Sequence, residues 1–404
     1  MKVHTIKAST RLPLLIGMCL LFPLSIWSQS ASEPESKVSL KYTNKGFQLK
    51  TEDDKFLLHL ESRLQFRFAT PGDQNPLNLD DLVTEKPVFK INRARLKVGG
   101  HAFDPNLKYY WEYELGQGNL LDFRVMYEKF EAFKIKVGQW KTFYNRERVI
   151  SSGKQQLAER SIITRPFTID RQQGVSVYGR LFKETLADLT YHTSVLTGMG
   201  RGAFDNDDNN FMYVGRLQWN FLGRELGMTS SDLEFHEKPV GLVAVAALTN
   251  RSPFTRFSQA GGGQLIGYNE GVAGQYRVNQ GLLETAFMYK GFSWQNEFHR
   301  KQIDDRVNDR VTTLVGSYYQ AGYFFHSLWN AIPRPLELAA RYARYVPDTE
   351  LPQNLEEEYT IGLNWFFRGH RNKLTAEISV FDYQTDVNDF ESRTRFRVQW
   401  DISF

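Results

Sequence analysis

The sequence has a single cysteine, Cys19, which lies within the first thirty of its 404 residues. That stretch has a basic start, an apolar run over residues 12–26 and a small-residue exit at residues 28–30. An apolar run of about 15 residues is shorter than the ~20 that a membrane-spanning helix needs. We therefore predict that residues 1–30 are a secretory signal peptide. The mature chain then has no cysteine, which excludes disulfides and thiolate metal sites.

The sequence also has a small net charge and few long apolar runs. The formal charge of +4 falls to +1 once Lys2, Lys7 and Arg11 leave with the signal peptide, so overall charge identifies no class of partner. No apolar run after Ile26 approaches the length of about 18 residues that predicts a membrane-spanning helix. No basic helical surface suggests a nucleic-acid partner. The histidines show no metal-type spacing, and no catalytic constellation stands out. We predict neither an enzyme, nor a metal site, nor a cofactor.

Aromatic residues and strict alternation are what the sequence does have. Aromatic side chains make up 14% of the chain. Over residues 107–115 the odd positions read Leu, Tyr, Trp, Tyr and Leu, while the even positions include Lys108, Glu112 and Glu114. Such a segment of ~10 residues with one apolar face has the length of a tilted membrane strand. The pattern favours an outer-membrane barrel over a soluble β-sandwich.

Sixteen such segments follow one another, and their connectors are alternately long and short. A barrel with long extracellular loops and short periplasmic turns has this asymmetry, and an even count puts both ends of the barrel on the periplasmic side. We predict an all-β fold, a transmembrane antiparallel up-and-down β-barrel of about 16 strands over residues 56–404, preceded by a short N-terminal segment, 31–55. The expected strands are 56–68, 89–103, 107–116, 121–130, 133–141, 173–182, 186–197, 211–221, 240–249, 282–290, 292–301, 314–325, 336–345, 357–367, 373–384 and 394–404.

The chain ends on the alternating segment "TRFRVQWDISF". We expect this last strand to pair with the first and close the barrel, with its apolar side against outer-membrane lipid and lipopolysaccharide. We also expect the barrel assembly machinery to recognise Phe404.

Closure brings the basic faces of the first, second and last strands together. They must face the lumen, because each Arg or Lys directed at the lipid midplane costs ~2–4 kcal/mol. The alternative is neutralisation by acids of the neighbouring strands, through pairs such as Arg95–Glu112 or Arg93–Glu114. The residues that we predict to line the pore and bind anions are Arg63, Arg67, Arg93, Arg95, Lys97, Lys134, Lys136, Arg160, Arg395 and Arg397.

Connector 142–172 carries six basic residues against three acidic ones. A connector of this length in a compact barrel is usually functional, and we predict that it folds into the lumen and constricts it. The alternative is a solvated outer loop. Arg matches the oxygens of phosphate or carboxylate bidentately, and rings of Arg and Lys make pores favour anions.

Several blocks resemble the phosphate-selective porin O and P family. They include "INRARLKVGGHAFDPNLKYYWEYE", "FKIKVGQWKTFYNRE", "LAERSIITRPFTIDRQQGVSVYG" and "IGLNWFFRGHRNKL". The resemblance implies a sixteen-stranded outer-membrane barrel, commonly a homotrimer, with Arg and Lys lining the pore for inorganic phosphate or other small anions. The chain departs from the family at residues 142–145, where it reads Thr-Phe-Tyr-Asn instead of Thr-Pro-Phe-Gly.

We therefore predict a passive, anion-preferring porin of the Gram-negative outer membrane. The alternative is a barrel blocked by connectors 142–172 and 250–281 that acts as a receptor or a structural protein. Single-channel conductance separates the two, because a blocked barrel is silent.

Overall fold

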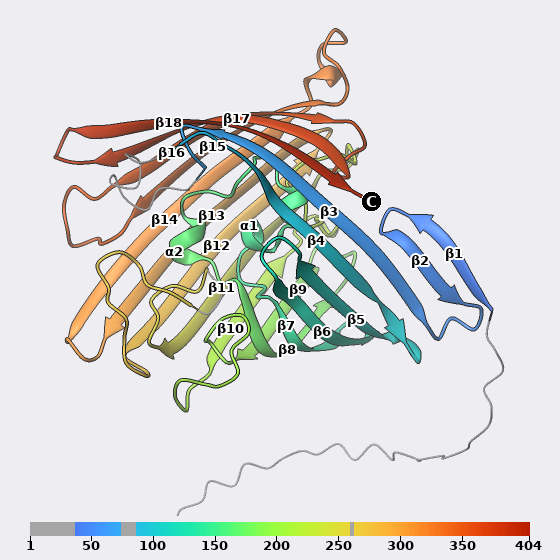
Figure 1. The fold of residues 1–404 in the computed structure, drawn as a ribbon, viewed down its shortest axis with the longest axis horizontal. Coiled ribbons are helices and arrows are strands. Elements are labelled where there is room, and N and C mark those ends of the chain that lie inside the picture. The colour runs from blue at the N-terminus through green and yellow to red at the C-terminus, as the bar shows by residue number, and fades with distance from the viewer. Residues whose placement is uncertain (1–36, 74–85, 259–261) are drawn as a thin grey trace, which may run out of the picture. The chain divides into compact units, whose positions relative to one another are not determined.

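The computed structural model describes residues 37–73, 86–258 and 262–404. The predicted signal peptide lies outside them. In the described part of the chain, eighteen strands form one antiparallel sheet, of which β3 to β18 close into a barrel of sixteen (Figure 1). No helix within these ranges is long and apolar enough to cross a bilayer.

The barrel strands match the sixteen predicted segments, with ends that shift by a few residues. Their bounds are β3 (Leu57–Thr70), β4 (Val88–Ala102), β5 (Asp104–Glu114), β6 (Asn119–Phe130), β7 (Phe133–Lys141), β8 (Arg171–Leu181), β9 (Leu189–Leu196), β10 (Met212–Trp219), β11 (Val240–Ser252), β12 (Tyr276–Tyr289), β13 (Phe292–Asp305), β14 (Arg310–Tyr323), β15 (Leu336–Val346), β16 (Glu356–Phe366), β17 (Asn372–Gln384) and β18 (Phe390–Ser403).

The outward face of the barrel is apolar and the inward face polar. On β16, Tyr359, Ile361 and Leu363 are 45%, 55% and 48% exposed, whereas the alternating Glu358 and Thr360 are buried. A soluble protein would show the opposite arrangement, whereas a barrel in lipid needs this one.

The barrel closes where the last strand meets the first, as predicted. Pairing runs from Ser403↔Arg63 to Phe396↔Thr70. Beyond it, the Phe404 N–H donates to the Ser62 carbonyl at 3.0 Å, and the Ser62 N–H donates to the Phe404 carbonyl at 2.8 Å. The role of Phe404 in assembly stays a prediction.

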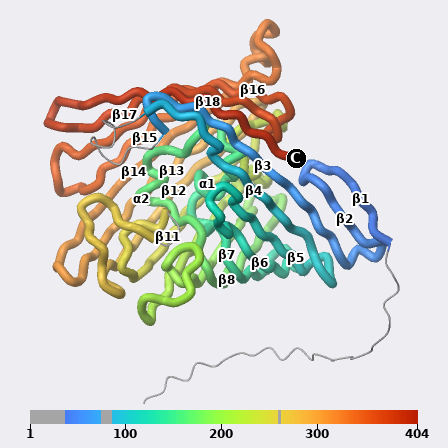
Figure 2. Tube along the Cα trace, in the orientation of Figure 1, coloured from blue at the N-terminus to red at the C-terminus, as the bar shows by residue number. Residues whose placement is uncertain are grey.

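A hairpin precedes the barrel, within the predicted N-terminal segment. It consists of β1 (Val38–Thr43) and β2 (Gly46–Thr51). β2 pairs with Leu57 to Leu60 of β3, the part of β3 that extends past β18 (Figure 2). An uncovered strand edge would offer unpaired N–H and carbonyl groups, and the hairpin satisfies them.

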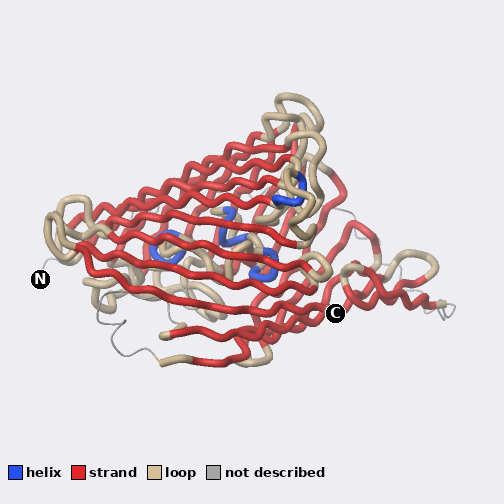
Figure 3. Tube along the Cα trace, turned by 90° about the horizontal axis from the view of Figure 1, so that it is seen from above, coloured by secondary structure: helices blue, strands red, loops and turns tan. Residues whose placement is uncertain are grey.

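The connector between β7 and β8 lies inside the barrel, as predicted. We call residues 142–170 the constriction loop. It contains three short helical turns, α1 (Arg146–Val149), η2 (Ser152–Lys154) and α2 (Thr164–Phe167), which Figure 3 shows within the ring of strands.

Apolar packing inside the barrel, by the constriction loop and by Leu226 of the connector between β10 and β11, explains two strands whose alternation is weak in the sequence. The inward residues of β11 include Val240, Leu242 and Leu248, and those of β14 include Leu314 and Tyr318. Together with other strands, these residues pack against apolar side chains inside the barrel rather than against water. Both parities of these strands are therefore apolar.

Candidate functional site: the constricted lumen

Buried glutamates of the barrel wall hold the constriction loop in place. Each projects inward from a different strand between β12 and β17 and accepts hydrogen bonds from the loop, most of them from backbone N–H groups. The contacts are Arg146 N–H to Glu284 (3.0 Å), Glu147 N–H to Glu297 (2.7 Å), Gln156 Nε2 to Glu337 (2.7 Å), Ile162 N–H to Glu358 (2.8 Å) and Ala158 N–H to Glu377 (2.8 Å). Hydrogen bonds to charged groups are the stronger kind, so five of them fix the path of the loop.

Apolar packing fixes the same loop against the wall from β9 to β15. Tyr144, Ile163, Phe167 and Ile169 of the loop are buried with inward residues of those strands and with Phe257 of the connector between β11 and β12. This packing fills that side of the lumen.

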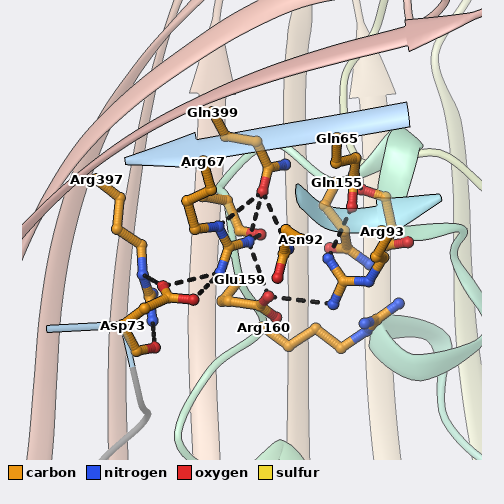
Figure 4. A network of polar contacts seen from close by, with 12 residues as sticks. Gln65, Arg67, Asp73, Asn92, Arg93, Gln155, Glu159, Arg160, Arg397 and Gln399 are labelled. Carbon is orange, nitrogen blue, oxygen red and sulfur yellow. Dashed lines mark hydrogen bonds and ion pairs between the residues drawn. The ribbon is translucent and has the colours of Figure 1, made fainter. Parts of the chain in front are cut away.

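Opposite this packing, where β18, β3 and β4 meet, three arginines gather around two acids (Figure 4). Arg67 contacts Asp73 at 3.0 Å and Glu159 at 2.8 Å. Arg93 contacts Glu159 at 3.1 Å, and Arg397 contacts Asp73 at 2.7 Å. Burial opposes the ionisation of Glu159, yet Arg93 and Arg67 hold the pKa of its carboxyl well below the usual range. We call these five residues the outer cluster. It keeps more positive than negative groups.

On the wall formed by β4 and β5, by contrast, the basic charge is offset by acids. Arg95 contacts Glu112 at 2.6 Å and Glu114 at 2.7 Å. Of the two pairs considered from the sequence, Arg95–Glu112 therefore forms. The other does not form, because Arg93 is bound to Glu159 of the loop. Arg95 is thus a neutralising partner of two buried acids.

Reversing the charge of Arg95 should therefore cost stability. Arg95→Glu would leave Glu112 and Glu114 buried beside a third carboxylate, and breaking a buried pair costs roughly 3–5 kcal/mol. Urea unfolding of the barrel in lipid vesicles measures this loss. Arg277→Glu is the matched control, because Arg277 is exposed on β12 and forms no ion pair within the described ranges. Equal unfolding midpoints for the two variants would contradict the assignment.

A polar cavity of about 460 Å³ opens at the periplasmic end, beneath the constriction loop. We call it the inner cavity. Its charged lining consists of Lys45, Arg63, Lys97, Lys154, Arg371 and Glu61.

The basic groups of the inner cavity differ in how they are engaged. Lys97 is paired with Glu61. Arg63 donates to the hydroxyls of Ser151 and Ser152 at 2.8 and 2.7 Å. Lys45 and Lys154 are exposed and have no ion pair in the part of the chain that the structure describes. Lys45 was missed from the sequence, because it lies in the hairpin turn outside every predicted strand.

Lys136 occupies an aromatic cage rather than an open wall. Its Nζ lies 5.1 Å from the ring centroid of Trp140, 4.9 Å from that of Phe143 and 4.7 Å from that of Tyr178. Cation–π attraction stabilises the ammonium there. Lys134, on the same face of β7, is partly exposed.

Comparison with known proteins decides the family. The model of the family "phosphate-selective porin O and P" matches residues 64–389. The chain belongs to this family. The porin therefore spans the outer membrane of a Gram-negative cell and forms a channel-type barrel. No curated protein matches it in sequence.

Solved structures share the porin's fold at low sequence identity. One is an anion-selective porin from Comamonas acidovorans, at 10% identity and a TM-score of 0.55, with 86% of this chain and 99% of that one covered. Another is the outer membrane channel DcaP of Acinetobacter baumannii, at 10% identity and a TM-score of 0.55, with 86% and 97% covered. A third is OmpF of Salmonella typhi in complex with daunomycin, at 11% identity and a TM-score of 0.54, with 87% and 99% covered.

Two further residues that we predicted to line the pore are engaged by other groups of the porin. Arg160 donates to the Glu147 carbonyl at 2.8 Å and to the Ile150 carbonyl at 2.7 Å, so its guanidinium supports the loop from within. Arg395 lies over the ring of Phe381 at 4.5 Å. A role of either residue toward anions stays a prediction.

Proposed function

We propose that the porin gives passive, anion-preferring diffusion of phosphate-like oxyanions through a passage lined by Arg and Lys. The observation that carries this proposal is the inner cavity, with five basic groups against one acidic group. The outer cluster adds an excess of arginine on the other side of the constriction loop. An anion would thus meet a positive field before and after the narrowest part of its path.

The types of basic group suit an oxyanion. Lys45 and Lys154 supply mobile point charges. Arg63 and Arg371 add fixed positive charge, because their guanidinium nitrogens already donate to hydroxyl and carbonyl oxygens of the protein. Such groups favour anions in a pore without holding them long when several weak sites follow one another. We propose this lining role for the residues predicted from the sequence. Acids largely offset Lys97 and Arg95, aromatic rings enclose Lys136, and loop carbonyls engage Arg160.

Reversal potentials between phosphate and chloride solutions test this proposal. With potassium phosphate on one side of a planar bilayer and potassium chloride on the other, we expect a potassium permeability below that of either anion, and phosphate permeability comparable to that of chloride. Permeation by chloride with phosphate excluded would leave an anion porin but overturn the oxyanion assignment.

The second candidate is a loop-blocked barrel that serves as a receptor or structural protein. The apolar packing of the constriction loop with Phe254 and Phe257 inside the barrel favours it. Purified protein that inserts into bilayers without conductance steps would establish this candidate.

Three expected partnerships stay predictions: a homotrimer, contact with lipopolysaccharide and recognition by the assembly machinery. Size-exclusion chromatography with light scattering tests the homotrimer.

A further inference from the structure

A second cavity lies at the opposite end of the lumen from the inner cavity, near the extracellular ends of β14, β15 and β16. Its volume is about 230 Å³, and we call it the outer pocket. Apolar side chains line most of it, among them Ile162 of the constriction loop, Leu265 of the connector between β11 and β12, and Leu314 and Tyr345 of the wall. Its charged groups are Arg165, Arg256 and Glu356.

Arg256 is the unusual member of this lining. Its side chain is only 7% exposed, and its Nε has no hydrogen-bond partner. No carboxylate within residues 37–73, 86–258 and 262–404 forms an ion pair with it, although other buried arginines of this barrel have acidic partners. An unpaired buried charge is costly, so a guanidinium held in this state at a cavity is suited to an anionic ligand.

The segment that carries Arg256 is held firmly. Gln264 accepts from the N–H and the hydroxyl of Thr255, and the Thr255 hydroxyl accepts from the Leu265 N–H at 2.8 Å. The neighbouring Phe257 accepts the Asp170 N–H at 2.9 Å, which ties this segment to the constriction loop. The backbone that carries Arg256 is therefore held in place, which lowers part of the entropic cost of binding.

We propose that the outer pocket binds small carboxylates with an apolar ring or chain, with the carboxylate at Arg256 and the apolar body against Leu265, Leu314 and Tyr345. An engineered cavity of roughly 150 Å³ is large enough for benzene, so this pocket has room for a ring and a carboxylate. Hydrated phosphate gains nothing from apolar walls. Burial of an apolar ring or chain in the pocket is favourable, because it removes apolar surface from water. The pocket thus serves a ligand class different from that of the inner cavity, and the proposal does not depend on the proposed ion selectivity.

Saturation-transfer NMR on the folded, detergent-solubilised porin tests the pocket, with benzoate as the probe and acetate and inorganic phosphate as comparisons. We expect benzoate to bind more tightly than either comparison. Arg256→Met should weaken benzoate binding by about tenfold to a hundredfold, because a hydrogen bond to a charged group is lost. Arg310→Met is the matched control, since the Arg310 side chain is exposed at the same end of the barrel and does not line the pocket, and should leave binding unchanged.

A second pair of variants decides the matter even if Arg256→Met does not fold. Ile266 lines the pocket and is 59% exposed, so substitution there leaves the core intact. Ile266→Glu should weaken benzoate binding by about tenfold through repulsion, whereas the equally large Ile266→Gln should not. Equal binding of acetate and benzoate, or equal binding by the Glu and Gln variants, would overturn the proposal.

Discussion

Replacing residues 151–159 of the constriction loop with a Gly-Gly link is expected to raise single-channel conductance several-fold. The Arg160 guanidinium contacts the Ile150 carbonyl at 2.7 Å, so the two ends of the deleted stretch lie near each other. The deletion removes the loop contacts to Glu337 and Glu377 and the part of the loop that roofs the inner cavity. A wider cross-section carries more current. Recordings from planar bilayers in potassium chloride measure the change.

An equal shortening of the connector between β9 and β10, at residues 201–209, is the control. That connector joins the extracellular ends of two strands and supplies no residue to the inner cavity. Its shortening should leave conductance close to that of the parent. If the loop variant and this control conduct alike, the constriction loop does not set the width of the passage.

The double variant Lys45→Glu, Lys154→Glu is expected to abolish or invert anion preference. The change turns the inner cavity from five basic groups against one acidic group into three against three. Two charges ~4 Å apart interact by about 4 kcal/mol at an effective dielectric constant of 20, so even a small part of this difference shifts permeation measurably. Both lysines are exposed, so the barrel should fold normally. The reversal potential in a potassium chloride gradient reports the preference.

Lys41→Glu, Lys290→Glu makes the same charge change at exposed positions outside the inner cavity. Lys41 lies on the hairpin and Lys290 in the turn between β12 and β13, so overall charge is matched while the passage is untouched. We expect the parent's reversal potential from this control. The same shift in both double variants would assign selectivity to the general surface field rather than to the cavity.

The strands could be predicted because the membrane imposes a simple rule on them. Every residue that faces lipid must be apolar, so β16 and β18 are recognisable in the sequence from alternation alone. The hairpin of β1 and β2 escaped prediction because its strands have only six residues each and belong to no long alternating segment.

The interior could be predicted only in outline. Inward parity directs Arg67, Arg95 and Arg397 away from the lipid, but parity does not specify their partners. In the sequence Glu297 cannot be told from a solvated acid. Its role in holding the constriction loop depends on the N–H of Glu147, which lies 150 positions earlier in the chain. The partners of the arginines depend in the same way on the path of the constriction loop, which long-range contacts decide.

The reversal potential of the unmodified porin in a potassium chloride gradient tests the central claim most directly, that an open passage beside the constriction loop is biased toward anions by the basic groups at both of its ends. We predict stepwise conductance and a zero-current potential of the sign set by chloride. A potential of the sign set by potassium, or inserted protein without any conductance, would contradict it.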